Sequence, residues 1–233
     1  MIKIENIETM GWEHAIRGMR NPKNSWDKSD SKVCAGHEFG LCDNCSEKSD
    51  CINDGGFLVG ENNLKLMMAL RNAGTDHRKF MRMIAVYVDI TAPLYWWKEF
   101  DTYKVGTVAN SCSTMHKIHE KEFTLDDFSC EHLIDEPFPI TDEYVETYLD
   151  CMTDTIKALN CARRMFLETG EKKYWWQIIQ LLPSSYNQTR TVTMTYENIY
   201  TMRQQRKGHK LDEWRIDFFN WSDELPHLKE LFD

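Results

Sequence analysis

Lys79–Tyr103 reads KFMRMIAVYVDITAPLYWWKEFDTY, a stretch that places a strand directly before a helix. Between Lys79 and Thr91 the side chains alternate and become β-branched toward the end, which predicts a β-strand. Ala92-Pro93 interrupts that pattern. Leu94–Tyr103 then has the character of a helix with the proline at its first turn. The boundary between the two elements therefore falls at the Ala-Pro pair.

The same reasoning extends to both sides of this stretch. Alternating apolar and polar residues predict strands over Met1–Thr9 and Gln188–Thr195. Apolar residues at spacings of three to four predict helices, and Gly170 is a suitable stop for the longest of them. Thr141 is its expected cap. The expected helices cover Gly11–Arg20, Glu61–Gly74, Thr141–Thr169, Tyr174–Leu182, Asn198–Lys207 and Leu211–Trp221.

Length and composition restrict the class of protein. A chain of 233 residues with 42% hydrophobic and 28% charged residues is expected to form one domain, residues 1–233. The net charge of -9 argues against broad binding to duplex nucleic acid or to an anionic membrane, because lysine and arginine drive both. No apolar run is long enough to span a bilayer, and the first 20 residues lack the pattern of a signal peptide. We therefore expect a cytoplasmic location.

A polar insertion at about residues 24–56 contains a cluster of metal-ligand residue types, namely Cys34, His37, Cys42, Cys45 and Cys51. The C-x-x-H and C-x-x-C pairs supply four ligands of the kind that tetrahedral zinc prefers. Only four residues separate the pairs, which is shorter than the common finger spacing. Structural zinc, free thiols on a loop and a redox role therefore remain as alternatives, with a catalytic zinc least favoured.

Two further segments carry polar or basic side chains. Thr107–Met115, TVANSCSTM, is small and polar and predicts a loop. The basic residues near the C-terminus indicate either a solvated helix face or a surface with ion pairs to Asp212 and Glu213; they are Arg203, Arg206, Lys207, His209, Lys210 and Arg215. The chain contains no Walker-type or dinucleotide-type glycine loop, no G-x-S-x-G and no H-E-x-x-H.

Several short motifs follow one another along the chain. Asp76-His77-Arg78-Lys79-Phe80 precedes the predicted strand, and Ala92-Pro93 follows it. Asn110 and Ser113 lie in the polar segment after the next helix. Later in the chain come Leu182-Pro183 and then Arg206, His209 and Glu213.

This order, over roughly residues 60–220, resembles the flavin-dependent thymidylate synthases. In that family E-H-x-x-F and an Ala-Pro break lead to the signature R-H-R-x-x-S-x-N-x-x-S-x-R, and an L-P pair precedes a unit that ends in Arg, His and Glu. Here Thr102-Tyr103-Lys104 occupies the R-H-R position, and Met115 replaces the final arginine. Thr107 occupies the position of the first serine of the signature. Asn110 lies one residue after the position of its asparagine, and Ser113 matches its second serine.

The resemblance implies an α+β fold with a mainly antiparallel sheet and packed helices. It also implies a homotetramer that binds FAD at subunit interfaces and modifies the pyrimidine nucleotide dUMP, with NADPH and methylenetetrahydrofolate as further reactants. By this resemblance Ser113 and Arg206 contact the nucleotide, and the flavin contacts are His77, Lys104, Asn110 and His209. No catalytic residue is assigned.

Three functional hypotheses follow. The first is a thymidylate synthase-like enzyme that methylates or otherwise modifies C5 of a pyrimidine nucleotide. The second is a non-catalytic nucleotide-binding or interaction protein on the same scaffold, with a zinc-stabilised loop, which the missing arginines favour. In the third, the likeness is a coincidence on an ordinary α+β protein. Arg190 and Arg203 are candidates to replace the lost cations, although structural roles explain them equally well.

Overall fold

The computed structural model describes residues 2–34, 51–52, 56–139, 141 and 145–232. Its contacts divide the chain into two compact units. Unit 1 comprises Met1–Lys3, Ile90–Thr102 and Asn110–Arg190, and unit 2 comprises Ile4–Asp89, Tyr103–Ala109 and Thr191–Asp233. Among the described residues no helix is long and apolar enough to cross a membrane.

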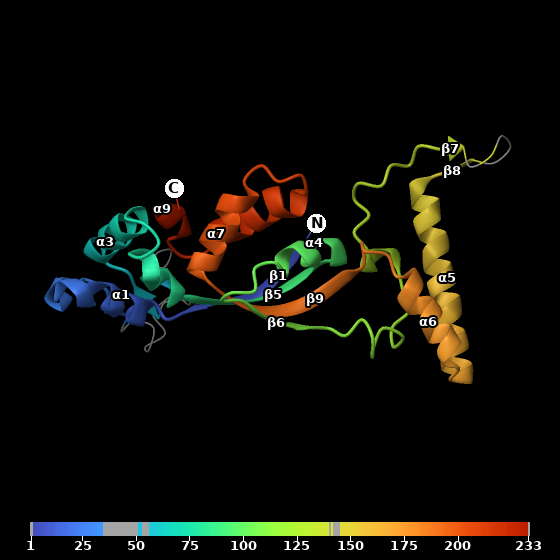
Figure 1. The fold of residues 1–233 in the computed structure, drawn as a ribbon, viewed down its shortest axis with the longest axis horizontal. Helices are drawn as coiled ribbons and strands as arrows, with labels where there is room; N and C mark the ends of the chain where they lie inside the picture. The colour runs from blue at the N-terminus through green and yellow to red at the C-terminus, as the bar shows by residue number, and fades with distance from the viewer. Residues whose placement is uncertain (1, 35–50, 53–55, 140, 142–144, 233) are drawn as a thin grey trace. The chain divides into compact units, whose positions relative to one another are not determined.

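The largest sheet has four strands in the order β1-β5-β9-β6 (Figure 1). These strands cover Lys3–Met10 for β1, Ala85–Pro93 for β5, Asn187–Thr195 for β9 and Val108–Ser111 for β6. Strands β5, β6 and β9 each continue from one unit into the other. The expected α+β fold is confirmed.

Unit 1 is dominated by a pair of helices that lie side by side, α5 and α6 (Figure 1). Thr147 caps α5 by accepting the N–H of Asp150, whose carboxylate in turn accepts the N–H of Thr147. Gly170 ends α5 in the left-handed conformation, as predicted. The elements of this unit outside the large sheet are α4 (Leu94–Phe100), 3₁₀ helix η6 (Leu125–Asp127), β7 (Phe138–Pro139), β8 (Val145–Glu146), α5 (Tyr148–Thr169) and α6 (Lys172–Leu181).

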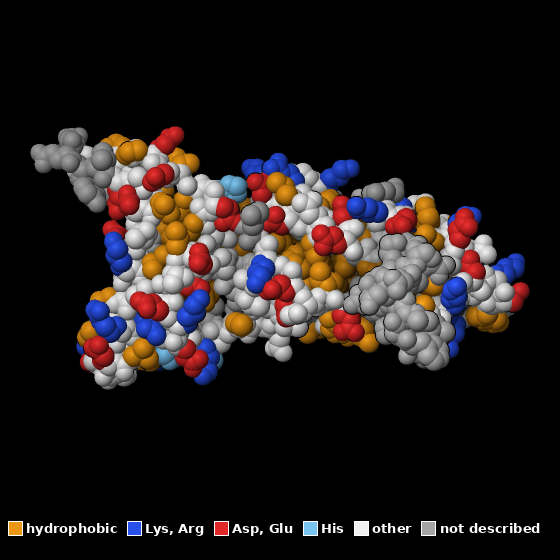
Figure 2. Space-filling model, turned by 180° about the vertical axis from the view of Figure 1, so that it is seen from behind, with side chains coloured by type: hydrophobic (Ala, Val, Ile, Leu, Met, Phe, Trp, Pro, Cys, Tyr) orange, Lys and Arg blue, Asp and Glu red, His pale blue; other side chains and the backbone are white. Residues whose placement is uncertain are grey.

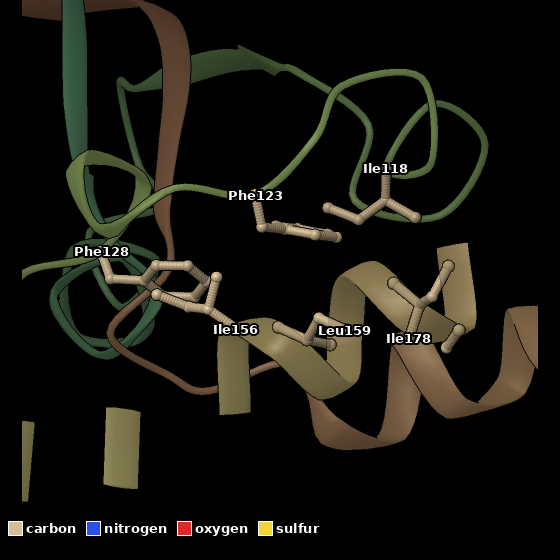
Figure 3. Packing of buried hydrophobic residues seen from close by; sticks show 7 residues of the cluster. Ile118, Phe123, Phe128, Ile156, Leu159 and Ile178 are labelled. Atoms are coloured by element: carbon tan, nitrogen blue, oxygen red, sulfur yellow. The ribbon is translucent and has the colours of Figure 1, made fainter. Parts of the chain in front are cut away.

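The core of unit 1 forms where α5 and α6 pack against the segment that follows β6. Figure 3 shows the side chains of this cluster pointing toward one another. Asn160 ties the segment to α5, since its side chain both accepts from the N–H of Phe123 at 2.9 Å and donates to the oxygen of Phe123 at 2.8 Å. The cluster consists of Ile118, Phe123, Phe128, Ile156, Leu159, Ala162 and Ile178.

Unit 2 has an aromatic core. Trp12 packs edge-on against Tyr196 with ring centroids 5.1 Å apart, and the Tyr196 hydroxyl donates to the oxygen of Pro226 at 2.8 Å. Burial raises the pKa of Tyr196 well above its usual value. The helices of this unit are α1 (Trp12–Arg20), α3 (Glu61–Asn72), α7 (Tyr196–Arg206), α8 (Phe219–Asp223) and α9 (Leu228–Phe232), with 3₁₀ helices η1 (Asn21–Lys23), η2 (Trp26–Lys28) and η5 (Arg78–Arg82) and the π-helical segment η7 (Glu213–Phe218).

A second, smaller sheet belongs to unit 2 and has the order β2-β4-β3. Strand β4 (Phe57–Leu58) pairs antiparallel with both β2 (Lys32–Val33) and β3 (Cys51–Ile52). Leu58 lies opposite Lys32 on one side and Cys51 on the other. The described part of the polar insertion at 24–56 therefore contributes η2, β2 and β3.

Two element predictions were wrong in their bounds. The predicted strand Lys79–Thr91 begins as the 3₁₀ helix η5 and becomes a strand only at Ala85, after which β5 runs through the Ala-Pro pair to Pro93. The α5 helix begins at Tyr148 rather than at Thr141, because the capping box of Thr147 and Asp150 fixes its start.

One further prediction was wrong in type. Part of the predicted loop Thr107–Met115 forms β6, whose residues are all exposed. Its end is held by backbone atoms, since Cys112 N–H donates to the oxygen of Thr189 at 2.9 Å. Strand pairing of this kind needs no apolar side chains. The predicted helix Leu211–Trp221 is confirmed, since residues 212–223 are helical throughout, with η7 in the π-helical form followed by α8.

We predict that Leu159→Ala lowers the free energy of unfolding by about 3 kcal/mol, because Leu159 is fully buried and its removal leaves a cavity in the unit 1 core. Leu167→Ala on the same helix is the control, since that side chain is 53% exposed and should change stability by less than about 0.5 kcal/mol. Urea unfolding measures both. Equal losses in the two variants would contradict the packing described here.

Candidate functional site

Arg206, the last residue of α7, gathers a group of aromatic and basic side chains in unit 2. Its Nε donates to the Tyr103 hydroxyl at 2.9 Å. Its guanidinium carbon lies 4.9 Å from the centroid of the Trp214 ring and 5.4 Å from that of Tyr103. We call Tyr103, Lys104, Arg206, His209 and Trp214 the Arg206 corner. A guanidinium between aromatic faces is held in place by cation–π attraction.

The turn that carries Tyr103 and Lys104 is fixed to the start of α7. The Asn198 side chain donates to the oxygen of Val105 at 2.7 Å and also completes the N-terminal cap of α7 with Thr195. Gly106 has a φ of +84°, and a Cβ at this position would lie 2.8 Å from the side-chain oxygen of Asn198. Only glycine fits both the backbone conformation and the close approach.

His209 faces two donors at once. The N–H of Leu211 donates to its Nδ1 at 3.2 Å, and Nη1 of Arg206 lies 3.1 Å from its Nε2. A neutral imidazole has one acceptor nitrogen, so it accepts from Leu211 or from Arg206 but not from both. The contact between Arg206 and His209 is therefore easily exchanged for a contact with another acceptor.

Acidic as well as basic side chains stand near this corner, since the buried Glu213 directly precedes Trp214. Lys104, Lys207 and Lys210 are exposed. Two of the other predicted basic residues have internal acidic partners: Arg215 pairs with Asp212, and Arg203 pairs with Asp223 at 2.7 Å. Elsewhere basic and acidic side chains are interspersed over the face in Figure 2. The prediction of a solvated basic face thus holds for Lys207 and Lys210, and the predicted ion pair to Asp212 is formed by Arg215, whereas Arg203 pairs with Asp223 instead of Asp212 or Glu213.

His77 lies in another part of unit 2, at the N-cap of η5. Its exposed side chain helps to line a cavity of 620 Å³, together with Lys23, Lys79 and Phe80 among others. The lining thus combines an imidazole, two ammonium groups and an aromatic ring with one carboxylate, that of Asp76.

The opposite end of α7 is held by a clamp of charged groups. Arg78 and Arg82, both on η5, each bind the carboxylate of Glu197 in the first turn of α7. Arg78 also covers the Tyr200 ring, with its guanidinium carbon 4.6 Å from the ring centroid. Burial raises the pKa of Glu197, but the two guanidiniums outweigh it and hold that pKa below the usual 4.5.

The structure brings together only some of the predicted site residues. Arg206 and His209 are in contact. Lys104 directly follows Tyr103, whose hydroxyl accepts the hydrogen bond from Arg206. His77 is farther away: Arg78, the residue after it, binds Glu197, and Glu197 lies about 13 Å from Arg206 along α7. Asn110 is exposed on β6 in unit 1. Ser113, also in unit 1, accepts the N–H groups of Met115 and His116 at 3.2 and 2.8 Å.

Arg190 and Arg203, the two arginines suggested as replacements for the missing motif arginines, both bind partners within the chain. Arg190 stacks 4.2 Å from the centroid of Trp97, pairs with Asp101 at 2.7 Å and donates to Gln188 at 3.0 Å. Arg203 donates to the oxygen of Phe219 at 3.1 Å besides its pairing with Asp223. Both arginines therefore have structural roles.

The metal prediction concerns residues that are mostly outside the described part of the chain. His37, Cys42 and Cys45 lie there, whereas Cys34 and Cys51 belong to the described part and are partly exposed. The N–H of Cys34 donates to the oxygen of Gly56 at 3.3 Å, which extends the β2–β4 pairing. Within the described residues no group of three or more metal-ligand side chains is present. Zinc binding stays a prediction.

Sequence reasoning missed several residues that shape this site. Tyr103 occupies the middle of the segment matched to R-H-R, so its position was a usable signal. Trp214 directly follows Glu213, the last matched residue, so the position of Trp214 was a usable signal as well. Gly106 and Asn198 gave no such signal, because they contact each other across more than 90 residues of sequence.

The sheet order and the surrounding helices define the fold of the flavin-dependent thymidylate synthases. Two structures of thymidylate synthase X (ThyX) from Helicobacter pylori with FAD and dUMP match with TM-scores of 0.64 and 0.62, each at 14% identity. The first match covers 100% of this chain and 98% of that one, and the second covers 98% of both.

A further match is the UMP/dUMP methylase PolB from Streptomyces cacaoi bound with 5-Br UMP, with a TM-score of 0.59 at 11% identity over 100% of this chain and 92% of that one. At such identities the likeness establishes the fold alone. The sequence matches no model of a known protein family. No relative is found among curated proteins.

We predict that Glu197→Gln lowers stability by about 2 kcal/mol at pH 7, since it leaves Arg78, 18% exposed, without its counter-charge and weakens the half-exposed Arg82 pair. The carboxylate stabilises the fold above its unfolded pKa, and this contribution is lost as the pH falls through the lowered folded pKa. The difference from the wild type should therefore shrink below pH 4.5. Thermal unfolding across this pH range measures it.

Glu224→Gln provides the control for this experiment, because Glu224 is an exposed carboxylate of the same unit. Its replacement should have little effect at any pH. A Glu197→Gln difference that stays constant down to pH 3 would show that the carboxylate's charge is not what holds α7.

Proposed function

We propose that this chain binds a pyrimidine nucleotide and modifies C5 of its uracil ring with the help of a flavin. The observation that carries the proposal is the Arg206 corner, which joins the two chain segments matched to the family's signature motif and to its terminal Arg-His pair. The match over the entire chain to enzymes solved with dUMP or a UMP analogue supports it.

The nucleotide would bind through its phosphate at Arg206. The guanidinium is already oriented by Tyr103 and Trp214, so little side-chain freedom is lost on binding. A phosphate oxygen can replace His209 as the acceptor for Nη1, and His209 then keeps the bond from Leu211. Lys104 is exposed and adds a second positive charge nearby. Ser113 is the other proposed nucleotide contact.

The flavin is proposed on similar grounds. The volume of the His77 cavity and its lining by Lys23, Lys79 and Phe80 support a phosphate-bearing ring system there, although Asp76 adds one negative charge to the wall. FAD, when bound, supplies hydride transfer. His77, Lys104, Asn110 and His209 remain the proposed contacts. NADPH as reductant, methylenetetrahydrofolate as carbon donor and a homotetramer that completes the site belong to the same proposal.

The departures from the family motif predict weaker binding. Thr102 and Met115 stand where arginines are expected, and Arg190 and Arg203 are held by internal partners. Each lost charged hydrogen bond to phosphate should cost about 1.5–3 kcal/mol. Lysine at position 104 keeps its charge but loses the planar two-point contact of arginine. We therefore expect nucleotide affinity below that of an enzyme with the complete motif.

The proposal is tested by the absorbance spectrum of the protein, as purified and after incubation with FAD, and by thermal unfolding with dUMP and UMP. We expect a flavin band and a rise in Tm with at least one nucleotide. Arg206→Ala should weaken nucleotide binding by about tenfold or more, through loss of a charged contact. Arg215→Ala is the matched control, because Arg215 pairs with Asp212 and should leave binding unchanged.

A protein that stays colourless with FAD and does not respond to either nucleotide would overturn the proposal. Equal loss of nucleotide binding in Arg206→Ala and Arg215→Ala would move the nucleotide away from the Arg206 corner.

A second candidate function is a non-catalytic nucleotide-binding or interaction protein with a zinc-stabilised loop. The observation in its favour is the loss of charge at Thr102 and Met115, with no available arginine to replace it among Arg190 and Arg203. Cys34 directly follows β2 and Cys51 begins β3, so the candidate ligands Cys34, His37, Cys42, Cys45 and Cys51 all lie between or at the ends of two strands of the small sheet.

We predict that the purified protein contains one zinc per chain. Cys42→Ser should lower the zinc content and the Tm of the protein, because structural zinc contributes directly to folding. Cys161→Ser, an exposed thiol on α5, is the control and should change neither. Metal analysis and thermal unfolding provide the readouts. Unchanged zinc content and Tm in Cys42→Ser would exclude the site.

A further inference from the structure

Arg20 is a buried cation at the end of α1, with only 4% of its surface exposed. Its Nε donates to Oδ1 of Asn63 at 2.6 Å, and its Nη1 donates to the backbone oxygen of Ser25 at 3.1 Å. Both acceptors are neutral. A guanidinium has five N–H groups, and toward the described residues Nη2 donates no hydrogen bond.

Asp30, a carboxylate bonded to Asn63 of this network, is already used. Asp30 accepts the N–H groups of Asn62 and Asn63 at 2.7 and 3.1 Å and so caps α3. Among the described residues Arg20 has no acidic partner. A buried charge without a counter-charge is unfavourable, and the negative end of the α1 dipole offsets it only in part.

A cavity of 480 Å³ lies beside Arg20. Lys23 and Lys28 stand with Arg20 in its wall, and none of the described residues of that wall is a carboxylate. The remaining lining residues, Ser25, Asn62 and Leu66, add a hydroxyl and an amide. The volume is typical of small-molecule sites, and charged and neutral donors together are the groups that bind phosphate.

We propose that this cavity is a phosphate site, which takes inorganic phosphate or the phosphate end of a small ester. Arg20, 4% exposed, supplies guanidinium donors to it, and Lys23 and Lys28 supply charge from the exposed side. The site is built from α1, η1, η2 and α3, and so shares no residue with the Arg206 corner. Lys23 also borders the His77 cavity, whereas Lys28 does not. Lys28 is therefore the residue that tests this site.

The test is thermal unfolding of the full chain in sodium phosphate, compared with sodium chloride at equal ionic strength. We expect a saturable rise in Tm that is specific to phosphate. Lys28→Gln should raise the half-saturating concentration about tenfold, through loss of one charged contact. Lys65→Gln is the matched control, since Lys65 is exposed on α3 and pairs with Glu61. Arg20→Lys, which keeps the charge but removes the Nη2 donors, should weaken binding as well.

Arg206→Ala separates this site from the proposed nucleotide site. A phosphate response that survives in Arg206→Ala and weakens in Lys28→Gln supports the proposal, whatever the outcome with FAD and dUMP. A response equal to that of chloride, or one that is unchanged in Lys28→Gln, overturns it. Ribose 5-phosphate distinguishes the source: tighter binding than inorganic phosphate indicates an ester ligand, and equal binding indicates the free anion.

Discussion

Charged contacts at both ends of α7 determine how unit 2 is assembled. At the first turn, Glu197 holds Arg78 and Arg82 of η5, and at the last residue Arg206 holds Tyr103. Asn198 fastens the turn after Tyr103 to the same helix. Because these partners come from distant parts of the sequence, α7 fixes where both the His77 segment and the Tyr103 turn lie.

The sequence predicted the elements whose pattern is local and failed where contacts across the chain decide the structure. The strand β9 and the end of α5 at Gly170 follow from alternation and from a glycine stop. Strand β6 was missed because its four exposed residues carry no apolar pattern. Segment η5 is a 3₁₀ helix instead of the predicted start of a strand. Its two arginines bind Glu197, which comes more than 110 residues later in the sequence.

The same distinction applies to the candidate site. Arg206 and His209 were matched to the same terminal motif of the family, and they are three residues apart in sequence and in contact. The roles of Arg190 and Arg203 could not be read from the sequence, because Asp101, Trp97 and Asp223 reach them only through the fold. An arginine near a motif is therefore weak evidence of a binding role until its internal partners are known.

Because β5, β6 and β9 each pass from one unit into the other, neither unit can be expressed as one continuous fragment of the chain. Each unit is composed of three separate pieces of chain, so no single continuous fragment contains either of them. Pairing within the large sheet joins residues that are far apart in sequence, which slows folding by raising the entropy cost of closing long loops. We propose that residues 1–233 form one domain, in which case expression of truncated halves yields unfolded chains.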